Sequence, residues 1–238
     1  MRGRQHIMHM GLSLLVVPLL MICCGITMPK TIPTGTSSYT VRVNGTEVGK
    51  AVMSNTLHND EYTYTSRITM GNALMKHTIS HVIVEKTDFT PVRLETHEIT
   101  TQDGREIRSD LLATFDGQTV TIKDGDHTAR VTLKDDFVLD GNYFTHKLIQ
   151  NNFREGFTAS VRVYDPSIEL QQTIPVTFEV IGEETIMTGM KPVATIHLRQ
   201  RIGRVHAIDT YIDETGTAVK VIMEMMNMKM EITRDNKE

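Results

Sequence analysis

The sequence has 238 residues, with 25 Lys and Arg against 29 Asp and Glu, and a formal net charge of −4 at pH 7. Charges of both signs alternate along most segments, unlike the clustered cations of a protein that binds a phosphate backbone, so we expect no nucleic-acid partner. Both cysteines lie near the N-terminus, which leaves the body of the chain without a disulfide, a thiol nucleophile or a cysteine metal ligand.

The first 25 residues have the composition of an export signal. Two arginines among the first four residues precede an apolar run at residues 11–22, and Cys23, Cys24 and Gly25 follow. Such a run is too short to remain in a bilayer as a helix. We therefore predict that residues 1–25 carry the signal for export to the bacterial periplasm and that this leader is then cleaved. Without the two arginines, 23 cations face 29 acids, and the mature chain carries about −6.

The end of this leader leaves two kinds of processing open. A lipoprotein signal needs a cysteine at the first mature position, where the thiol is acylated, and Cys23 or Cys24 would serve. The residues before them, Met21 and Ile22, are not the usual small ones. Cleavage after Gly25 would instead give a soluble exported protein. We favour lipidation, which would make the chain an outer-membrane-anchored lipoprotein that meets the membrane only through this anchor.

The rest of the chain is predicted to form a linker and one domain. Residues 26–37 contain Pro29 and Pro33 and are predicted to be a linker. From residue 38 to 238 the composition does not shift, and no stretch approaches 18 apolar residues. We expect a single β-rich domain over residues 38–238, large enough to bury its own core.

Pairs of Asn or Asp with Gly punctuate this domain and predict tight turns between antiparallel strands. Both central positions of a two-residue hairpin need a positive φ, which these residues tolerate best. The pairs are Asn44-Gly45, Asp103-Gly104, Asp116-Gly117, Asp124-Gly125 and Asp140-Gly141, and the first four lie between alternating segments. Val41 and Val43, for example, share one strand face before the first turn. We count roughly a dozen strands, joined mainly as a meander.

A meander of this length is expected to curl, because strands twist and open edges invite aggregation. The predicted fold is mainly β: a single curled antiparallel meander, barrel or half-barrel, with one short helix. That helix is expected at residues 142–152, where Tyr143, Phe144, Leu148 and Ile149 fall near a 3.6-residue spacing. An apolar ligand or the helix would lodge in the concave face, and we expect Phe144 and Leu148 to line it.

The C-terminal segment is unusually rich in methionine, with five in the eight residues from Met223 to Met230. On a strand, Met226, Met228 and Met230 would point the same way. Thioethers could hold Cu(I) there, or the same flexible side chains could line a core or an apolar cavity. The intervening charged and amide side chains do not favour a dry metal site. We therefore predict that these three methionines line the cavity, and that there is no metal site.

Histidine, serine and carboxylate patterns give little support for catalysis. His77 and His81 would share a strand face about 13 Å apart, too far for one metal ion, so a solvated or cross-strand role is favoured. The chain has no Gly-x-Ser-x-Gly motif that would mark one serine as activated. Carboxylate pairs such as Asp135-Asp136 are typical of solvated turns. We predict no catalytic residues, no cofactor and no enzyme activity, and keep a hydrolase as a minor alternative.

Three short segments resemble those of exported bacterial β-rich proteins of unknown function, whose domains also precede transglutaminase-like domains. The segments are Tyr39–Gly49, Val161–Pro166 and Tyr211–Val221, and the similarity extends over residues 38–234. Members of that group are similar in architecture to the lipoprotein carriers LolA and LolB. The resemblance implies a curved sheet wrapped around a helix, with an apolar cavity for acyl chains. Tyr211 stands where a Trp is common in the group, which weakens any inference of a shared ligand.

The leading functional hypothesis is a non-enzymatic envelope protein that binds or carries an apolar, lipid-like ligand in the concavity of its sheet. Fifteen methionines and a low aromatic content suit an adaptable cavity. The alternative is a structural module that docks another envelope protein through a sheet edge or its outer face. A hollow interior would favour the first hypothesis, and a filled interior the second.

Overall fold

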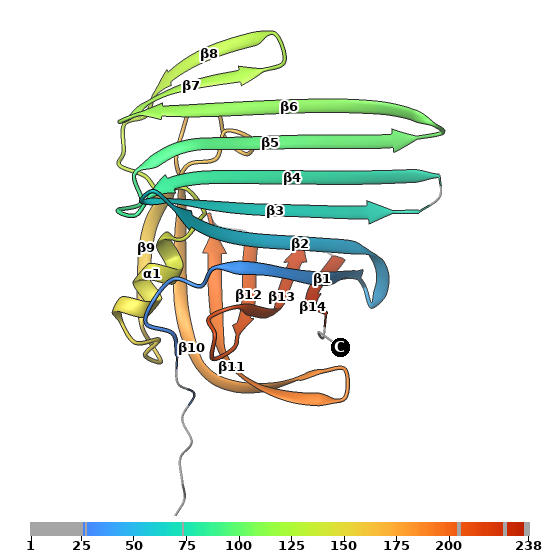
Figure 1. Cartoon of the computed structure of the whole chain (residues 1–238), viewed down its shortest axis with the longest axis vertical. Coiled ribbons are helices and arrows are strands. Elements are labelled where there is room, and N and C mark those ends of the chain that lie inside the picture. The colour runs from blue at the N-terminus through green and yellow to red at the C-terminus, as the bar shows by residue number, and fades with distance from the viewer. Residues whose placement is uncertain (1–25, 27, 73, 204–205, 226–227, 236–238) are drawn as a thin grey trace, which may run out of the picture.

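The structure is a computed structural model that describes residue 26 and residues 28–72, 74–203, 206–225 and 228–235. These residues form one 14-stranded antiparallel sheet and one short helix (Figure 1). The strands are β1 (Gly35–Val43), β2 (Thr46–His58), β3 (Glu61–Gly71), β4 (Met75–Lys86), β5 (Pro91–Gln102), β6 (Arg105–Asp116), β7 (Thr119–Asp124), β8 (His127–Thr132), β9 (Thr158–Val163), β10 (Ile174–Thr188), β11 (Lys191–Ile202), β12 (His206–Ile212), β13 (Ala218–Met225) and β14 (Met228–Arg234). The helix is α1 (Tyr143–Gln150).

The sheet confirms the predicted curled meander. The N-terminal strands β1 to β8 and the C-terminal strands β9 to β14 each pair with their sequence neighbours, and β1 pairs with β14 to join the two halves. The two halves run in different directions in Figure 1, as expected for a strongly twisted sheet. Strand β8 forms one edge and β9 the other, so the sheet is a half-barrel, not a closed barrel.

The connection after β8 lies in the gap between these two edges. Val138 forms a single parallel bridge with Val163 of β9, through hydrogen bonds of 3.0 Å to the backbone of Arg162 and Tyr164. Nearby, the Asp135 carboxylate accepts from Arg162 Nε at 2.8 Å. Part of the exposed edge of β9 is thereby covered, which reduces its tendency to pair with another chain.

The turns follow the chemistry of their residues. Asn44 and Gly45 have φ of 48° and 82° and lie in the β1–β2 turn, where both central residues of the hairpin need a positive φ. The β2–β3 turn uses Asn59 and Asp60, with φ of 49° and 62° and no glycine. Gly49 on β2 is required for another reason, since a side chain there would overlap the carbonyl oxygen of Thr69 on β3.

Buried apolar side chains on the concave side of the sheet form three clusters. One, under β4 to β8, includes Leu94, Val120 and Tyr164; another, where β1 meets β14, includes Val41 and Ile232. The third lies under α1 and contains Leu148, Phe153, Phe178, Val180, Ile196 and Ile212. No helix in the described part of the chain is long and apolar enough to cross a membrane.

Helix α1 is held between the sheet and the β4–β5 turn. Phe144 meets Phe178 of β10 edge to face, with ring centroids 5.1 Å apart. On the other side of the helix, the ring centroid of the buried Phe89 lies 5.7 Å from that of Tyr143 and 4.6 Å from that of His146. Such aromatic pairs add to the burial of apolar area. The helix therefore forms one wall of the hollow within the curl.

Candidate functional site

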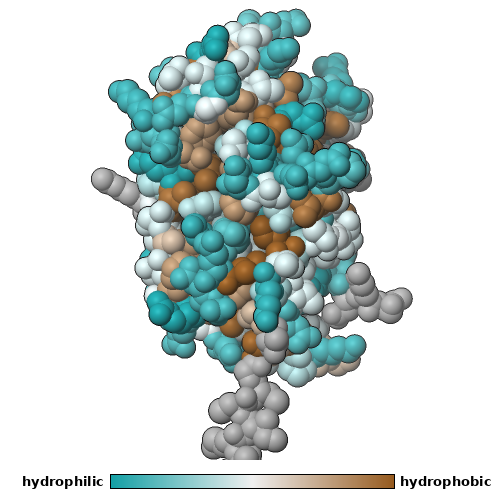
Figure 2. Space-filling model, turned by 60° about the vertical axis from the view of Figure 1, so that its left-hand side comes forward, coloured by the Kyte–Doolittle hydropathy of each residue, from teal (hydrophilic) through white to brown (hydrophobic). Residues whose placement is uncertain are grey.

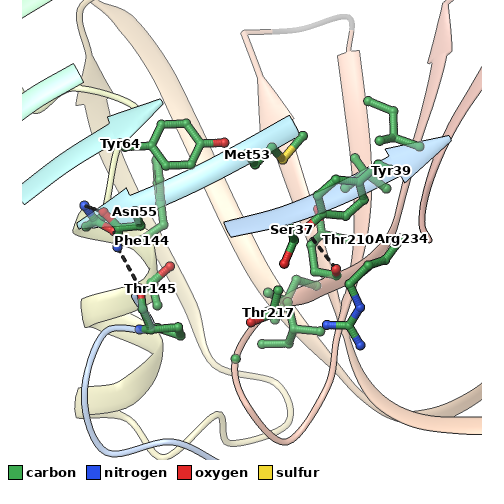
Figure 3. A pocket seen from close by; sticks show the side chains of 18 of the residues that line it. Ser37, Tyr39, Met53, Asn55, Tyr64, Phe144, Thr145, Thr210, Thr217 and Arg234 are labelled. Carbon is green, nitrogen blue, oxygen red and sulfur yellow. Dashed lines mark hydrogen bonds between the residues drawn. The ribbon is translucent and has the colours of Figure 1, made fainter. Parts of the chain in front are cut away.

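A cavity of about 1080 Å³ lies inside the curl, between α1 and the region where the two halves of the sheet meet. Figure 3 shows it between Phe144 on one side and Thr210, Thr217 and Arg234 on the other. Cavities that bind organic ligands typically measure about 300–1,000 Å³. This one is therefore large enough for a ligand with a long chain.

The walls of the cavity are mainly apolar. Strands on both sides of the β1–β14 junction and α1 contribute side chains, as alternation along each strand requires. The apolar lining consists of Tyr39, Met53, Ile68, Phe144, Leu148, Phe178, Leu198, Ile208, Ile212, Ala218, Val221, Met223 and Ile232. On the side of the molecule where α1 lies, Figure 2 shows apolar residues gathered along the middle of the face, with hydrophilic residues beside them.

The mouth of the cavity is bordered by small and hydroxyl-bearing residues. Thr34, Gly35 and Thr36 at the start of β1 are exposed and line it, as does Thr215 in the β12–β13 turn. The segment before β1 contacts that turn, because a side chain at Gly216 would meet the rings of Pro29 and Pro33. Part of the predicted linker thus forms the rim.

The β12–β13 turn on this rim is held by one carboxylate. Asp213 accepts hydrogen bonds from the Thr215 hydroxyl at 2.6 Å and the Thr215 amide at 2.9 Å. Arg234 of β14 donates to its other oxygen at 2.6 Å. Burial by itself would raise the pKa of Asp213, but Thr215 and Arg234 outweigh it and the pKa is lowered. The turn and the end of β14 therefore form one charge-balanced unit.

An amide and carboxyl network fixes the start of α1 against the sheet. Asn55 of β2 donates to Asn142 Oδ1 at 2.8 Å and to the Pro33 carbonyl at 2.8 Å, and Asn142 Nδ2 donates back to Asn55 at 3.2 Å. The Asn142 amide donates to Glu85 Oε1 at 2.6 Å. This network joins β2, β4, α1 and the segment before β1, and Asn55 and Asn142 both face the cavity.

Glu85 is fully buried beneath this loop, and its Oε2 has no hydrogen-bond partner among the described residues. Burial raises the pKa of Glu85, although the Asn142 amide opposes the shift. A side chain at Gly141 would collide with the Glu85 carboxyl. The loop therefore needs glycine at 141, and its packing disfavours the charged form of the Glu85 carboxyl.

We predict that Glu85→Gln increases the free energy of unfolding of the protein at neutral and alkaline pH. A raised pKa in the folded state stabilises the fold below the pKa of the unfolded chain, and this stabilisation is lost as the pH rises through the folded-state pKa. Each pKa unit by which the folded state differs from the unfolded chain corresponds to about 1.4 kcal/mol in the free energy of unfolding. Glutamine keeps an acceptor for Asn142 and cannot ionise.

Urea unfolding of both proteins from pH 4 to pH 9 measures this effect. The advantage of Glu85→Gln should be smallest at pH 4 and grow with pH, whereas the same change at the exposed Glu183 should show no such growth. A constant difference between the Glu85→Gln and native proteins across this range would contradict the assignment.

A second polar cluster lies on the outer face of β10 to β12. His197 is 7% exposed and contacts Asp209 at 2.8 Å and Glu184 at 3.2 Å, and it stacks on Tyr211 with ring centroids 4.5 Å apart. Arg199 binds Asp209 at 2.8 Å. Burial would raise the pKa of Asp209, but Arg199 and His197 outweigh it and the pKa is lowered. These polar contacts link β10, β11 and β12.

The structure brings together two of the residues expected at the cavity. Phe144 and Leu148 both line it. Met228 is 36% exposed and Met230 packs in the cluster around Ile232, and neither is part of the described cavity wall. Both share a strand face with Ile232, but they lie further along β14 than the cavity reaches. Met226 and the candidate lipidation residues Cys23 and Cys24 lie outside the described residues.

The two histidines of β4 each contact a threonine on the neighbouring strand. His77 Nδ1 lies 2.8 Å from the Thr100 hydroxyl, and His81 Nε2 lies 3.1 Å from that of Thr96. Both are cross-strand contacts, as favoured from the sequence. Among the described residues, no group of three or more His, Cys, Asp or Glu side chains has a geometry that could hold a metal ion.

Sequence reasoning missed most of the polar lining, including Asn55, Tyr64, Asn142 and Gln200. These residues come from β2, β3, the start of α1 and β11, and only the curl brings them together. The one local signal was the Asp-Gly pair before Asn142, which does not lie in a two-residue hairpin here and leads into α1.

Comparison with known proteins gives a family and a fold. The family model described as "Protein of unknown function (DUF3108)" matches residues 38–233. The crystal structure of a β-barrel-like protein of the domain of unknown function DUF1849 from Brucella abortus is similar, with a TM-score of 0.62 and 10% identity, over 86% of this chain and 96% of that one. At this identity the likeness concerns the fold alone.

A DUF1089 family protein from Pseudomonas aeruginosa has a TM-score of 0.38 and 12% identity, over 71% of this chain and 87% of that one. No curated protein matches the sequence.

Proposed function

The chain belongs to the DUF3108 family of proteins of unknown function, and from its hollow β half-barrel we propose that it binds an apolar, lipid-like ligand in the cavity. The observation that supports this most is the cavity itself, about 1080 Å³ with a mainly apolar lining. Apolar walls of this extent would be filled by side chains in a protein whose interior served only stability.

The lining suits a flexible chain better than a rigid ring system. Met53 and Met223 lie among aliphatic residues on the walls, and methionine adapts its shape to an irregular ligand. Each methylene group that leaves water contributes about 0.8 kcal/mol, so a chain of ten gains about 8 kcal/mol before the cost of ordering it. Tight binding of a single acyl chain is therefore within reach.

We propose that the protein is not an enzyme and that it holds its ligand unchanged. The described cavity wall contains hydroxyls, amides and charged groups but no histidine, so a hydroxyl there lacks the usual base to activate it. Incubation of an acyl ester with the protein, followed by mass spectrometry, would test this. Recovery of the intact ester agrees with the proposal, and catalytic release of its acid would contradict it.

We further propose export to the periplasm and an N-terminal lipid on Cys23 or Cys24. Ile26 and Met28 pack against the cluster under α1, and Pro33 lines the cavity. An anchor at this end would therefore hold the mouth close to the membrane. The intact mass of protein purified from membranes should show the acyl groups, and alanine at both cysteines should release it. A mass that fits cleavage after Gly25 would contradict lipidation.

The second candidate, a module that docks another envelope protein, has one observation in its favour. Met187 and Met190, at the end of the β10–β11 hairpin, are 59% and 95% exposed, and the hairpin projects from the body of the sheet (Figure 1). Exposed apolar tips of this kind occur at protein interfaces. The cavity favours ligand binding as the main function, because docking through a hairpin tip requires no hollow.

Ligand binding is tested on protein purified from membranes under native conditions. Native mass spectrometry before and after organic extraction should show loss of a lipid-sized mass, and the extracted protein should take up a fluorescent acyl probe at one site per chain. If nothing is bound after purification and no probe is taken up, lipid binding is the wrong function.

A further inference from the structure

Three of the polar side chains that line the cavity come from different parts of the fold. Tyr64 comes from β3, Asp140 from the loop before α1, and Gln200 from β11. We call them the inner polar patch. Asp140 is close enough to the other two that the Gln200 amide lowers its pKa and that its own charge raises the pKa of Tyr64.

The inner polar patch has hydrogen-bonding capacity that the described residues leave unused. Gln200 Nε2 is buried and lies near enough to Asp140 to lower the pKa of that carboxyl, but it forms no hydrogen bond of standard geometry in the described part of the chain. Tyr64 Oη forms no hydrogen bond there either. In Figure 3 the Tyr64 hydroxyl points into the open space of the cavity. Buried polar groups are normally paired, so an unpaired donor facing a cavity is a place for a partner on the ligand.

Asp140 is the one acid of the described lining that has no cationic partner. Asp140 lines the cavity and is exposed there, and partial desolvation by the surrounding protein raises its pKa, with a further rise from Asp165. No ion pair within the described residues includes it. A ligand group that donates a hydrogen bond would stabilise this carboxyl, and a negative charge beside it would not.

The cations that line the cavity are already neutralised. Arg234 binds Asp213 at 2.6 Å, and Arg199, whose side chain lies on the outer face, binds Asp209 at 2.8 Å. The third acid of the lining, Asp235, is 3.8 Å from Lys50. The described wall therefore offers no unpaired positive charge, and burying an anionic head group there would cost several kcal/mol.

We propose that the ligand is a single-chain amphiphile with an uncharged hydroxyl head, which donates to Asp140 and accepts from Gln200 Nε2 and Tyr64 Oη. This proposal rests on the proposed function. A hydroxyl both donates and accepts, so it can satisfy all three groups at once. An ammonium head can only donate, and it leaves Gln200 unpaired. A carboxylate head can only accept, and its negative charge would lie beside Asp140.

Competition between three ligands of equal chain length tests this preference. Dodecanol, dodecylamine and dodecanoate would each displace a fluorescent acyl probe from the native protein at pH 7.5. We expect dodecanol to compete at a concentration at least about tenfold lower than dodecanoate, with dodecylamine between them, since an unsatisfied buried polar group costs about 1–3 kcal/mol.

Two variants assign the preference to the inner polar patch. Gln200→Leu should weaken the binding of dodecanol about five- to tenfold and leave the affinity for the probe nearly unchanged. Asp140→Asn keeps the shape of the side chain and removes its charge, so the ratio between dodecanol and dodecanoate should fall. Asp126→Asn, at an exposed position in the β7–β8 turn, is the matched control and should keep the native ratio.

The outcomes separate this proposal from the proposed function. If the probe binds but dodecanoate competes as well as dodecanol, or if Asp140→Asn leaves their ratio unchanged, the hydroxyl preference is wrong and lipid binding stands. If neither the probe nor any of the three ligands binds, both proposals are wrong.

Discussion

Replacement of Thr210 by tryptophan is expected to weaken binding of a fluorescent acyl probe strongly, so that the dissociation constant of the probe rises by more than about 30-fold. Thr210 lies on β12, lines the cavity, and forms no side-chain hydrogen bond with the described residues. Figure 3 shows it on the wall opposite α1. An indole there would occupy the space of several methylene groups, each worth about 0.8 kcal/mol of binding. Fluorescence titration measures the loss.

The matched control is Val52→Trp on β2. Val52 is 43% exposed on the outer face, while its neighbours Ala51 and Met53 face inward. This variant introduces the same residue outside the cavity and should bind the probe with native affinity. Both variants should retain the circular dichroism spectrum of a β protein. If a folded Thr210→Trp protein binds as tightly as the control, the cavity does not hold the probe.

Gly49→Ala is expected to lower the free energy of unfolding by at least about 3 kcal/mol, because strands β2 and β3 cannot remain paired around the added methyl group. A Cβ at this position would overlap the carbonyl oxygen of Thr69 and reach 2.9 Å from Met70 Cα. Both obstacles are backbone atoms, so no rotamer change relieves them. Chemical denaturation in urea gives the shift in midpoint.

Gly45→Asn separates this backbone clash from the conformational freedom of glycine. Gly45 has a φ of 82°, which asparagine tolerates, and no atom lies within 4 Å of the position that a Cβ would take there. The expected loss is less than about 1 kcal/mol. Equal destabilisation by the two substitutions would show that the approach of β2 to β3 at Gly49 does not limit stability.

Local pattern was sufficient to predict the strands, the helix and the curl. Alternating apolar and polar residues and Asx-Gly turns define hairpins between strands that are neighbours in the sequence, so local sequence is enough to predict them. The turn at Asn59 and Asp60 has no glycine and was not predicted from the sequence, although Asx residues tolerate its positive φ. The β1–β14 pairing joins the ends of the domain, and no local pattern indicates such a contact.

The lining of the cavity was predictable only in part. Phe144 and Leu148 follow from the spacing of apolar residues on one helix, so their shared face could be inferred. How far the cavity extends along β14 depends on the shape of the curl. The position of Met230 beyond the cavity could therefore not be inferred from the sequence. Glu85 follows a register shift after Val84, and such a bulge breaks the alternation that would turn a charged residue outward.

The native chain contains no tryptophan, so a single introduced indole can report where a ligand chain lies. Phe144→Trp places this indole on the cavity wall, and Val52→Trp places it on the outer face. Titration of each protein with a dodecyl amphiphile brominated along its chain, which quenches indole on contact, tests most directly whether the half-barrel holds a chain in its hollow. Saturable quenching at one site in Phe144→Trp, with none in Val52→Trp, is the predicted result. Equal quenching of the two proteins, or no quenching of Phe144→Trp, would contradict it.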